Sequence, residues 1–306
     1  MIEYLEKLYN LEIETFIKYT NKTYKIVSTN GEYILKYVDD AKQENIFSRL
    51  YMLNDQIFLI PIKSINNRFI ERYKELYFIV TPYIKDESQI NKDIRLHFYV
   101  KSIASLHKLS DYGVNVSDGF FDESLNYLEK NIYKYKNELQ ARIERVERQD
   151  FFSPSDWYFL MNYNLLMNAL KESARRIESL DEEWNKKESI NLSLTYQNFD
   201  YEHINVKYQK IISLDKMVIA PCIYDLINIF NEAYISRIDI KKLFKEYMGI
   251  HPLEQYEIDW LLAFLFIPEY KTNVNIKDDI DYQFTLLSRL HSIENLATYL
   301  NSFNND

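Results

Sequence analysis

Charged and apolar residues recur at helical spacing over residues 1–20, which predicts an amphipathic helix at the start of the chain. β-forming residues then fill the stretches 22–28 and 33–38 on either side of an Asn-Gly pair, so a β-hairpin is expected there. A helical period from Asp39 to about Asn54 predicts a second helix. Three more strands are predicted at 57–62, 68–72 and 75–80, and the last is nearly all apolar, as in a central strand.

From Asn91 onwards the pattern is almost entirely helical. Long, charged helices are predicted at 123–148 and 155–179, and β character returns only around the segment 195–215. The sequence therefore predicts an α+β protein, with a small β-rich lobe at 1–84 and a large, mainly helical lobe at 85–306 that carries a hairpin around 195–215. The polar segment 83–87 is the expected hinge, and a cleft between lobes is where ligands preferentially bind.

Composition and charge exclude several classes of protein. The four glycines lack the spacing of the glycine-rich loops that bind nucleotide phosphates. The net charge of −9 argues against binding to nucleic acid or to a membrane surface, because both require clustered basic residues. No apolar segment reaches the roughly 20 residues needed to cross a bilayer, and residues 1–20 do not form a signal peptide. We therefore expect a cytoplasmic protein.

Three oxygen-bearing side chains have an informative spacing near the predicted hairpin. Asn205 follows Asp200 after four intervening residues, and Asp215 follows the second strand of the hairpin. Phosphoryl transfer needs one carboxylate to accept the proton of the attacking hydroxyl, and an amide oxygen and a second carboxylate to hold Mg²⁺. Asp200 is thus the candidate base, and Asn205 and Asp215 are the candidate metal ligands. On spacing alone, the alternative that Asp200 caps a turn and Asn205 starts a strand is favoured.

Two upstream residues change this balance. Lys36 lies on a predicted strand, like the kinase lysine that contacts the α- and β-phosphates of the nucleotide, and Glu44 lies on the next helix, where the carboxylate partner of that lysine belongs. Judged singly, each is more often a solvated side chain. Their order relative to Asp200, Asn205 and Asp215, on the expected elements, favours phosphoryl transfer.

Further motifs carry a resemblance to a known family. They are collinear over about residues 22–230, and they read Tyr33-Ile-Leu-Lys36, Thr81-Pro-Tyr-Ile84, Leu106-His-Lys-Leu109 and Tyr224-Asp-Leu226. With these motifs the chain resembles the aminoglycoside phosphotransferase/choline kinase branch of the protein-kinase-like fold, and most closely its spore-coat members of the CotS/YutH type. The charged helices at 123–179 look like the insert of the spore-coat members.

The resemblance implies a protein-kinase-like fold of two lobes, with ATP and Mg²⁺ as cofactors and a small-molecule hydroxyl as the phosphate acceptor. It implies that Thr81 and Tyr83 at the hinge contact the nucleotide. It also implies that Asn198, at the position of a supporting histidine, and Asp225, in the Tyr-Asp-Leu motif, support the catalytic loop. Spore-coat proteins are the implied partners, and the spore coat is an implied location.

Several positions depart from the family pattern. Asn198 and Phe199 stand where the family has His-Gly before the catalytic Asp. His203 and Ile204 replace Pro and Gly after it, and Lys216 follows the metal-binding Asp. The glycine permits a backbone geometry that Phe199 would adopt only with strain, and an inward-turned lysine would compete with the metal ion. Two alternatives therefore stay open: a catalytically impaired pseudokinase that acts as a scaffold component of the spore coat, and an unrelated helical interaction protein.

Two histidines have simpler interpretations. His107 lies on an apolar helical stripe, so it is expected to be a core histidine whose ring nitrogens are satisfied. His203 is expected to be a loop residue, with a contact to substrate as the alternative. The histidines of the chain show no ligand spacing that would indicate a metal cluster.

Overall fold

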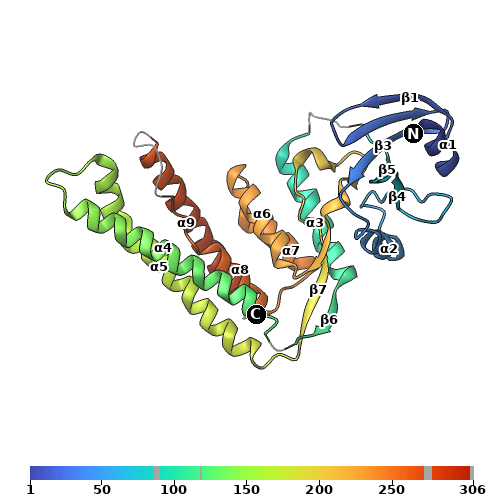
Figure 1. Cartoon of the computed structure of the whole chain (residues 1–306). Helices are drawn as coiled ribbons and strands as arrows, with labels where there is room; N and C mark the ends of the chain where they lie inside the picture. Colours follow the sequence, from blue (N-terminus) through green and yellow to red (C-terminus); the bar gives the residue numbers. More distant parts are fainter. Residues whose placement is uncertain (86–89, 118, 272–277, 304–306) are drawn as a thin grey trace. The chain divides into compact units, whose positions relative to one another are not determined.

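The computed structural model describes residues 1–85, 90–117, 119–271 and 278–303. The chain forms two compact units, of which the first comprises Met1–Tyr112 and Leu192–Asp225 and the second comprises Gly113–Asn191 and Leu226–Asp306 (Figure 1). The expected hinge at 83–87 lies partly outside the described residues. The expected division into lobes 1–84 and 85–306 stays a prediction.

The first unit is built on a five-stranded antiparallel sheet. In spatial order its strands are β1 (Ile13–Lys18), β2 (Thr23–Ser28), β3 (Gly31–Val38), β5 (Leu76–Pro82) and β4 (Ile70–Tyr73). Helix α1 (Ile2–Tyr9) packs against this sheet through a core that contains Leu5, Leu35 and Val80. Because side chains alternate along a strand, the burial of Leu35 in this core directs the next side chain, Lys36, to the opposite face.

The predicted helix over residues 1–20 is wrong in its second half. The helix ends at Tyr9, because Asn10 adopts the left-handed conformation with a φ of 53°. Residues 13–18 instead form β1, and Phe16 stacks on Tyr24 of β2 with ring centroids 4.9 Å apart. β1 lies at the edge of the sheet and is largely solvent-exposed, so its charged residues suit a strand as well as a helix. The charge pattern alone could not distinguish a strand from a helix over these residues.

The segment 57–62, predicted as a strand, makes an isolated parallel bridge between Phe58 and Ile211, and the N–H of Ile62 donates to the carbonyl of Val80 in β5 over 2.8 Å. Pro61 within it has no N–H to contribute to a sheet. The bridge joins this segment to a short antiparallel hairpin made of β8 (Ile204–Asn205) and β9 (Lys210–Ile211). It therefore holds the hairpin that carries Asn205.

The first unit contains further short elements. They are helix α2 (Glu44–Leu53), helix α3 (Lys92–Ser110), the 3₁₀ turns η1 (Tyr201–His203) and η2 (Leu214–Lys216), and strand β10 (Val218–Ala220). Strand β10 pairs antiparallel with the end of β7 (Ser189–Thr195), and Thr195 is the last residue before the loop of Asp200. Helix α2 starts later than the predicted Asp39 but ends, as predicted, at Asn54, which has a φ of 53°.

The second unit is mainly helical. It contains strand β6 (Tyr112–Asn115) and helices α4 (Asp122–Glu147), α5 (Pro154–Trp184), α6 (Ile223–Ile235), α7 (Ile240–Ile250), α8 (Gln255–Leu265) and α9 (Asp279–Phe303), with the first residues of β6 and α6 in the first unit. The two predicted charged helices are confirmed as α4 and α5, and a capping box at Ser153 starts α5. A buried ion pair between Arg142 and Asp279, 2.6 Å apart, joins α4 to α9. No helix in the described ranges combines the length and the apolar character that crossing a membrane requires.

Candidate functional site

A cavity of about 470 Å³ lies within the first unit. Its wall combines the β1–β2 turn, one face of β3 and β5, and the segments around η1 and η2. The wall is largely apolar, and its polar side chains include Lys36, Thr81, Tyr83, Glu202, His203 and Asp215. An apolar cavity with a few convergent polar groups is typical of small-molecule sites.

Lys36 and Asp215 form an ion pair in this wall. The Nζ atom of Lys36 donates to Oδ1 of Asp215 over 2.7 Å, and the two side chains are only 29% and 15% exposed. Shielding from water makes such a pair stronger than one on the open surface. Asp215 lies on η2 directly after Ser213 and Leu214, and Ser213 adopts the left-handed conformation with a φ of 60°. The fold thus brings two predicted site residues into one cavity from opposite ends of the unit's sequence.

Glu44 is engaged elsewhere. Its two carboxylate oxygens accept hydrogen bonds from the backbone N–H groups of Phe69 and Ile70, over 3.0 Å and 2.7 Å. These contacts attach the start of α2 to the start of β4. The role of Glu44 as the partner of Lys36 stays a prediction, and in this structure the lysine pairs with Asp215 instead.

The two hinge residues, Thr81 and Tyr83, both line the cavity. The backbone N–H of Tyr83 donates to the carbonyl of Glu32 over 2.8 Å, and the ammonium of Lys25 lies 3.9 Å from the centre of the Tyr83 ring. Burial, and then the neighbouring Tyr19, raise the pKa of Tyr83. Burial and these contacts therefore keep the Tyr83 phenol neutral and in place in the cavity wall.

Asp225 fixes the loop that leads to Asp200. Its carboxylate is fully buried and accepts hydrogen bonds from the backbone N–H groups of Tyr196 (2.7 Å) and Gln197 (2.8 Å). The ring of His107 lies 3.1 Å from the same carboxylate, so the Leu-His-x-Leu and Tyr-Asp-Leu motifs meet here. The interpretation of His107 as a satisfied core histidine is confirmed. A buried carboxylate needs such donors, and the loop needs such an acceptor.

The departures from the family pattern have local consequences. The side-chain amide of Asn198 donates to the carbonyl of Ser213 over 3.0 Å, which ties the loop of Asp200 to the segment of Asp215. Among the described non-glycine residues with positive φ, Gln197 is present (52°) and Phe199 is not, so the expected strain at Phe199 is absent. The Phe199 ring packs edge-on against Tyr99, with centroids 4.8 Å apart.

Asp200 makes a local contact, whereas Asn205 is held by one distant and one local contact. Asp200 is exposed and lies outside the cavity wall, and its carboxylate accepts from the backbone N–H of Glu202 over 2.9 Å. The Asn205 amide donates to the carbonyl of Lys85 over 3.0 Å and accepts from the N–H of Tyr208 over 3.0 Å. The fold holds Asn205 firmly, whereas Asp200 faces solvent.

The donor set can be compared with what Mg²⁺ requires. In the part of the chain that the structure describes, no three His, Cys, Asp or Glu side chains converge as a metal site. Asp215 lines the cavity and offers carboxylate oxygens of the kind that hold Mg²⁺, an ion usually bound by one or two protein oxygens, substrate phosphates and water. Asn205 is not part of the cavity wall, and its amide oxygen accepts from the N–H of Tyr208. Lys216 is exposed and lies outside the cavity wall, so the expected competition from an inward-turned lysine is not found.

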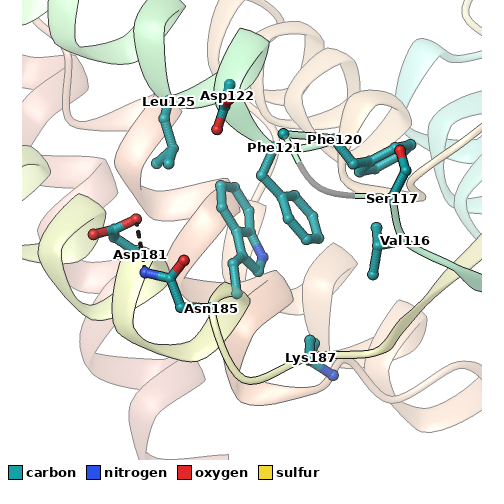
Figure 2. A pocket seen from close by; sticks show the side chains of 11 residues that line it. Val116, Ser117, Phe120, Phe121, Asp122, Leu125, Asp181, Asn185 and Lys187 are labelled. Atoms are coloured by element: carbon teal, nitrogen blue, oxygen red, sulfur yellow. Dashed lines mark hydrogen bonds between the residues drawn. The ribbon is translucent and has the colours of Figure 1, made fainter.

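The second unit has a cavity of its own, of about 270 Å³ (Figure 2). Phe121 stacks on Trp184 with centroids 4.0 Å apart, and Trp184 packs edge-on against Trp260. Asp181 accepts from the side-chain amide of Asn185 over 3.3 Å at the C-terminal end of α5 (Figure 2). Among the described lining residues Lys187 is the one cation, and it pairs with Glu254. This cavity has no lysine–carboxylate pair among its lining residues.

Sequence reasoning missed several residues of the cavity in the first unit. Tyr19 and Thr20 were assigned to a helix, although they occupy the β1–β2 turn that covers the cavity. Glu202 and Ser213 carry no motif of their own. Only their positions in the sequence could have indicated them, because Glu202 lies two residues after Asp200 and Ser213 lies two residues before Asp215.

Comparisons with known proteins agree on the fold. No protein-family model and no curated protein sequence matches the chain. An aminoglycoside phosphotransferase from Alicyclobacillus acidocaldarius has a similar structure, with a TM-score of 0.69 and 11% sequence identity over 97% of this chain and 94% of that one. A spectinomycin phosphotransferase solved as a complex with AMP has a TM-score of 0.53 and 16% identity over 96% of this chain and 92% of that one. At such low identities the likeness shows the fold alone, and it confirms the predicted α+β, protein-kinase-like fold class.

Proposed function

We propose that the protein is an ATP-dependent phosphotransferase that phosphorylates a hydroxyl group of a small molecule. The observation that carries this proposal is the Lys36–Asp215 ion pair in the wall of a cavity large enough for a ligand. A nucleoside triphosphate with its metal ion requires a cation and a carboxylate close together in a shielded site.

Most of the predicted site residues have a part in this proposal. Lys36 would neutralise the α- and β-phosphates, and Thr81 and Tyr83 would line the nucleotide end of the cavity. Asp215 and Asn205 would hold Mg²⁺, which when bound neutralises charge on the transferred phosphate. Asp225, through the N–H groups of Tyr196 and Gln197, would keep the loop in place during turnover. Asp200 is the base predicted from spacing.

The class of acceptor is supported by the names of the two structural neighbours, which are phosphotransferases of small molecules. In the complex of the second neighbour the bound nucleotide is AMP, which supports adenine nucleotides as ligands here. The acceptor itself is left open by this proposal. A location in the cytoplasm or the spore coat, and spore-coat proteins as partners, stay predictions that rest on the sequence resemblance.

Calorimetric titration with ATP, with and without Mg²⁺, tests the proposal. Wild-type protein should bind ATP, and Mg²⁺ should strengthen the binding. Asp215→Asn should bind ATP with little gain from Mg²⁺, because the amide is a weaker cation ligand. The exposed Asp181→Asn in the second unit is a control of matched chemistry. Absence of ATP binding to the folded wild-type protein would refute the proposal.

The second candidate function is a pseudokinase that binds nucleotide without turnover and serves as a scaffold. The exposure of Asp200, and the use of its carboxylate within its own loop, favour this alternative. It predicts binding of ATP by calorimetry together with no release of ADP by the wild-type protein in the presence of any acceptor. Release of ADP that depends on Asp215 would exclude it.

A further inference from the structure

Large apolar side chains are exposed in the second unit, at the end of the α4–α5 hairpin that carries the connection 148–153 (Figure 1). Phe151 in this connection is 90% exposed, and Trp157 and Met161 on α5 are 55% and 78% exposed. The ring of Phe152 packs edge-on against Trp157, with centroids 5.1 Å apart. Trp157 and Met161 are four residues apart and so share one face of the helix. We call these four residues the tip patch.

The tip patch is confined to one end of the hairpin. Further along the same face of α5, at helical spacing from Met161, the exposed residues are Asn164, Asn168 and Lys171. The face therefore becomes polar after the first turns of the helix. An exposed apolar patch with a polar border is typical of a surface that contacts another molecule. Its position indicates a partner that covers the end of the hairpin and not its length.

The backbone beneath the tip patch is fixed. The N–H of Asp156 donates to Oγ of Ser153 over 3.2 Å, and the N–H of Ser153 donates to Oδ2 of Asp156 over 3.2 Å. Pro154, at the first position of α5, has a φ that suits a helix start. The patch therefore needs little ordering when a partner binds, which lowers the entropic cost of association.

The charges beside the tip patch are balanced. Arg145, Glu147, Arg148 and Asp150 are all exposed, and two positive and two negative charges give a net charge of zero. The whole chain, by contrast, has a net charge of −9. A border of one sign would repel a second copy of itself, whereas a border of both signs can pair with itself across a twofold axis. An anionic membrane surface is less favoured, because it attracts clusters of basic residues without carboxylates.

We propose that the tip patch is the contact surface of a homodimer, in which two copies meet about a twofold axis with Arg148 of each copy beside Asp150 of the other. Six aromatic side chains, three from each copy, would bury about 1,000 Å² in total, since one aromatic side chain buries roughly 150–250 Å². This area is at the lower end of the range for specific interfaces. The dimer therefore dissociates on dilution, with a dissociation constant on the order of 10 µM.

Sedimentation velocity of the full chain tests the proposal. Between about 1 and about 300 µM, wild-type protein should change from monomer to dimer by mass action. Phe151→Glu should raise the dissociation constant about tenfold or more, because a charge replaces the most exposed ring. Tyr133→Glu is the matched control, since Tyr133 is 70% exposed on α4 and outside the patch, and it should leave the dissociation constant unchanged. A wild-type protein that stays monomeric, or an equal effect of the two variants, would overturn the proposal.

An exchange of charges tests the twofold arrangement. Arg148→Glu places two carboxylates against each other twice in the dimer, and Asp150→Arg does the same with two guanidinium groups. Each variant alone should raise the dissociation constant about tenfold. An equimolar mixture of the two should form heterodimers with an affinity close to that of the wild type, because opposite charges then face each other at both positions. Circular dichroism verifies that both variants are folded, and a mixture that stays monomeric would overturn the arrangement.

A vesicle assay tests the main alternative occupant. The wild-type protein should not co-sediment with vesicles of phosphatidylcholine and phosphatidylglycerol. Co-sedimentation that is lost in Phe151→Glu and kept in Tyr133→Glu, by a protein that is monomeric in solution, would overturn the homodimer and assign the tip patch to a membrane surface.

Discussion

Two of the cavities in the described structure, one in each unit, differ in chemistry as well as in size. The cavity of the first unit, about 470 Å³, contains the Lys36–Asp215 ion pair and is lined by residues distant in sequence. The cavity of the second unit, about 270 Å³, is built from two local segments around the stacked rings of Phe121 and Trp184 (Figure 2). The first offers paired charges to a ligand, whereas the second is organised around aromatic packing. Size alone therefore does not distinguish the two cavities, whereas the presence of paired charges does.

The largest effect is expected from the aromatic cavity and should appear in stability. Trp184→Ala removes a 95%-buried indole from contact with Phe121 and Trp260, and we expect the free energy of unfolding to fall by about 3–5 kcal/mol. Urea unfolding measures this loss. The affinity of the folded variant for ATP should be unchanged, and a large fall in that affinity would contradict the separate roles of the two cavities.

The next largest effect is expected in turnover. Lys36→Met removes the cation of the nucleotide cavity, and we expect kcat/KM for Mg²⁺–ATP to fall about 10²–10³-fold, because a fixed charge on the phosphates is lost. Lys216→Met is the matched control, since Lys216 is exposed and outside the cavity wall. Steady-state kinetics should show a large loss of kcat/KM in Lys36→Met and little loss in Lys216→Met. An equal loss in both variants would contradict a specific role of Lys36 in binding the phosphates.

A smaller effect should follow from Asp225→Asn. The amide that replaces the buried carboxylate directs a donor at the backbone N–H groups of Tyr196 and Gln197, so at least one hydrogen bond is lost. We expect about 1–3 kcal/mol of destabilisation, the cost of one unsatisfied buried group. Asp181→Asn, in the cavity of the second unit, should change stability by less than about 0.5 kcal/mol, because Asp181 is exposed. Differential scanning calorimetry compares the two variants.

The smallest effect is a dependence of stability on alkaline pH. Burial is the main cause that raises the pKa values of Tyr99 and Tyr196 in the first unit, and it raises that of Tyr282 in the second unit to about 12. Above pH 10 the unfolded chain loses these protons and the folded protein keeps them, so stability falls as pH rises. Each tyrosine adds about 1.4 kcal/mol per pH unit to this slope.

Tyr196→Phe tests this dependence. Between about pH 10 and 11 the unfolding free energy of the variant should fall less steeply with pH than that of the wild type, by the contribution of one tyrosine. An unchanged slope would mean that the hydroxyl of Tyr196 ionises in the folded protein.

Much of the fold could be predicted from the sequence, because the long helices and the apolar strands are strongly periodic. Such periodicity is present in the helices at 122–147 and 154–184 and in the strand at 76–82. β1 could not be predicted, since an exposed edge strand tolerates charges at any position. The segment 57–62 is apolar like a strand, but Pro61 interrupts it, and it makes an isolated bridge to Ile211 and a backbone hydrogen bond to Val80 in place of a strand pairing.

The candidate site was predictable in part. The order of Lys36 and Asp215 on their elements indicated a common site, and the fold pairs them. The contact between His107 and Asp225 joins two motifs that the sequence contains separately. The direction of the Asp200 and His203 side chains depends on a 3₁₀ turn and on hydrogen bonds to Asn198 and Glu202, which the spacing of an Asp and an Asn does not specify.

Amide hydrogen exchange with a non-hydrolysable ATP analogue and Mg²⁺ tests the central claim most directly, because it reports on both cavities at once. We expect slower exchange at 19–36, 79–84 and 202–215, and no change at 119–125 and 181–187. Slower exchange only at 119–125 and 181–187, or no change in any segment at saturating analogue, would contradict the claim that the Lys36–Asp215 cavity is the nucleotide site.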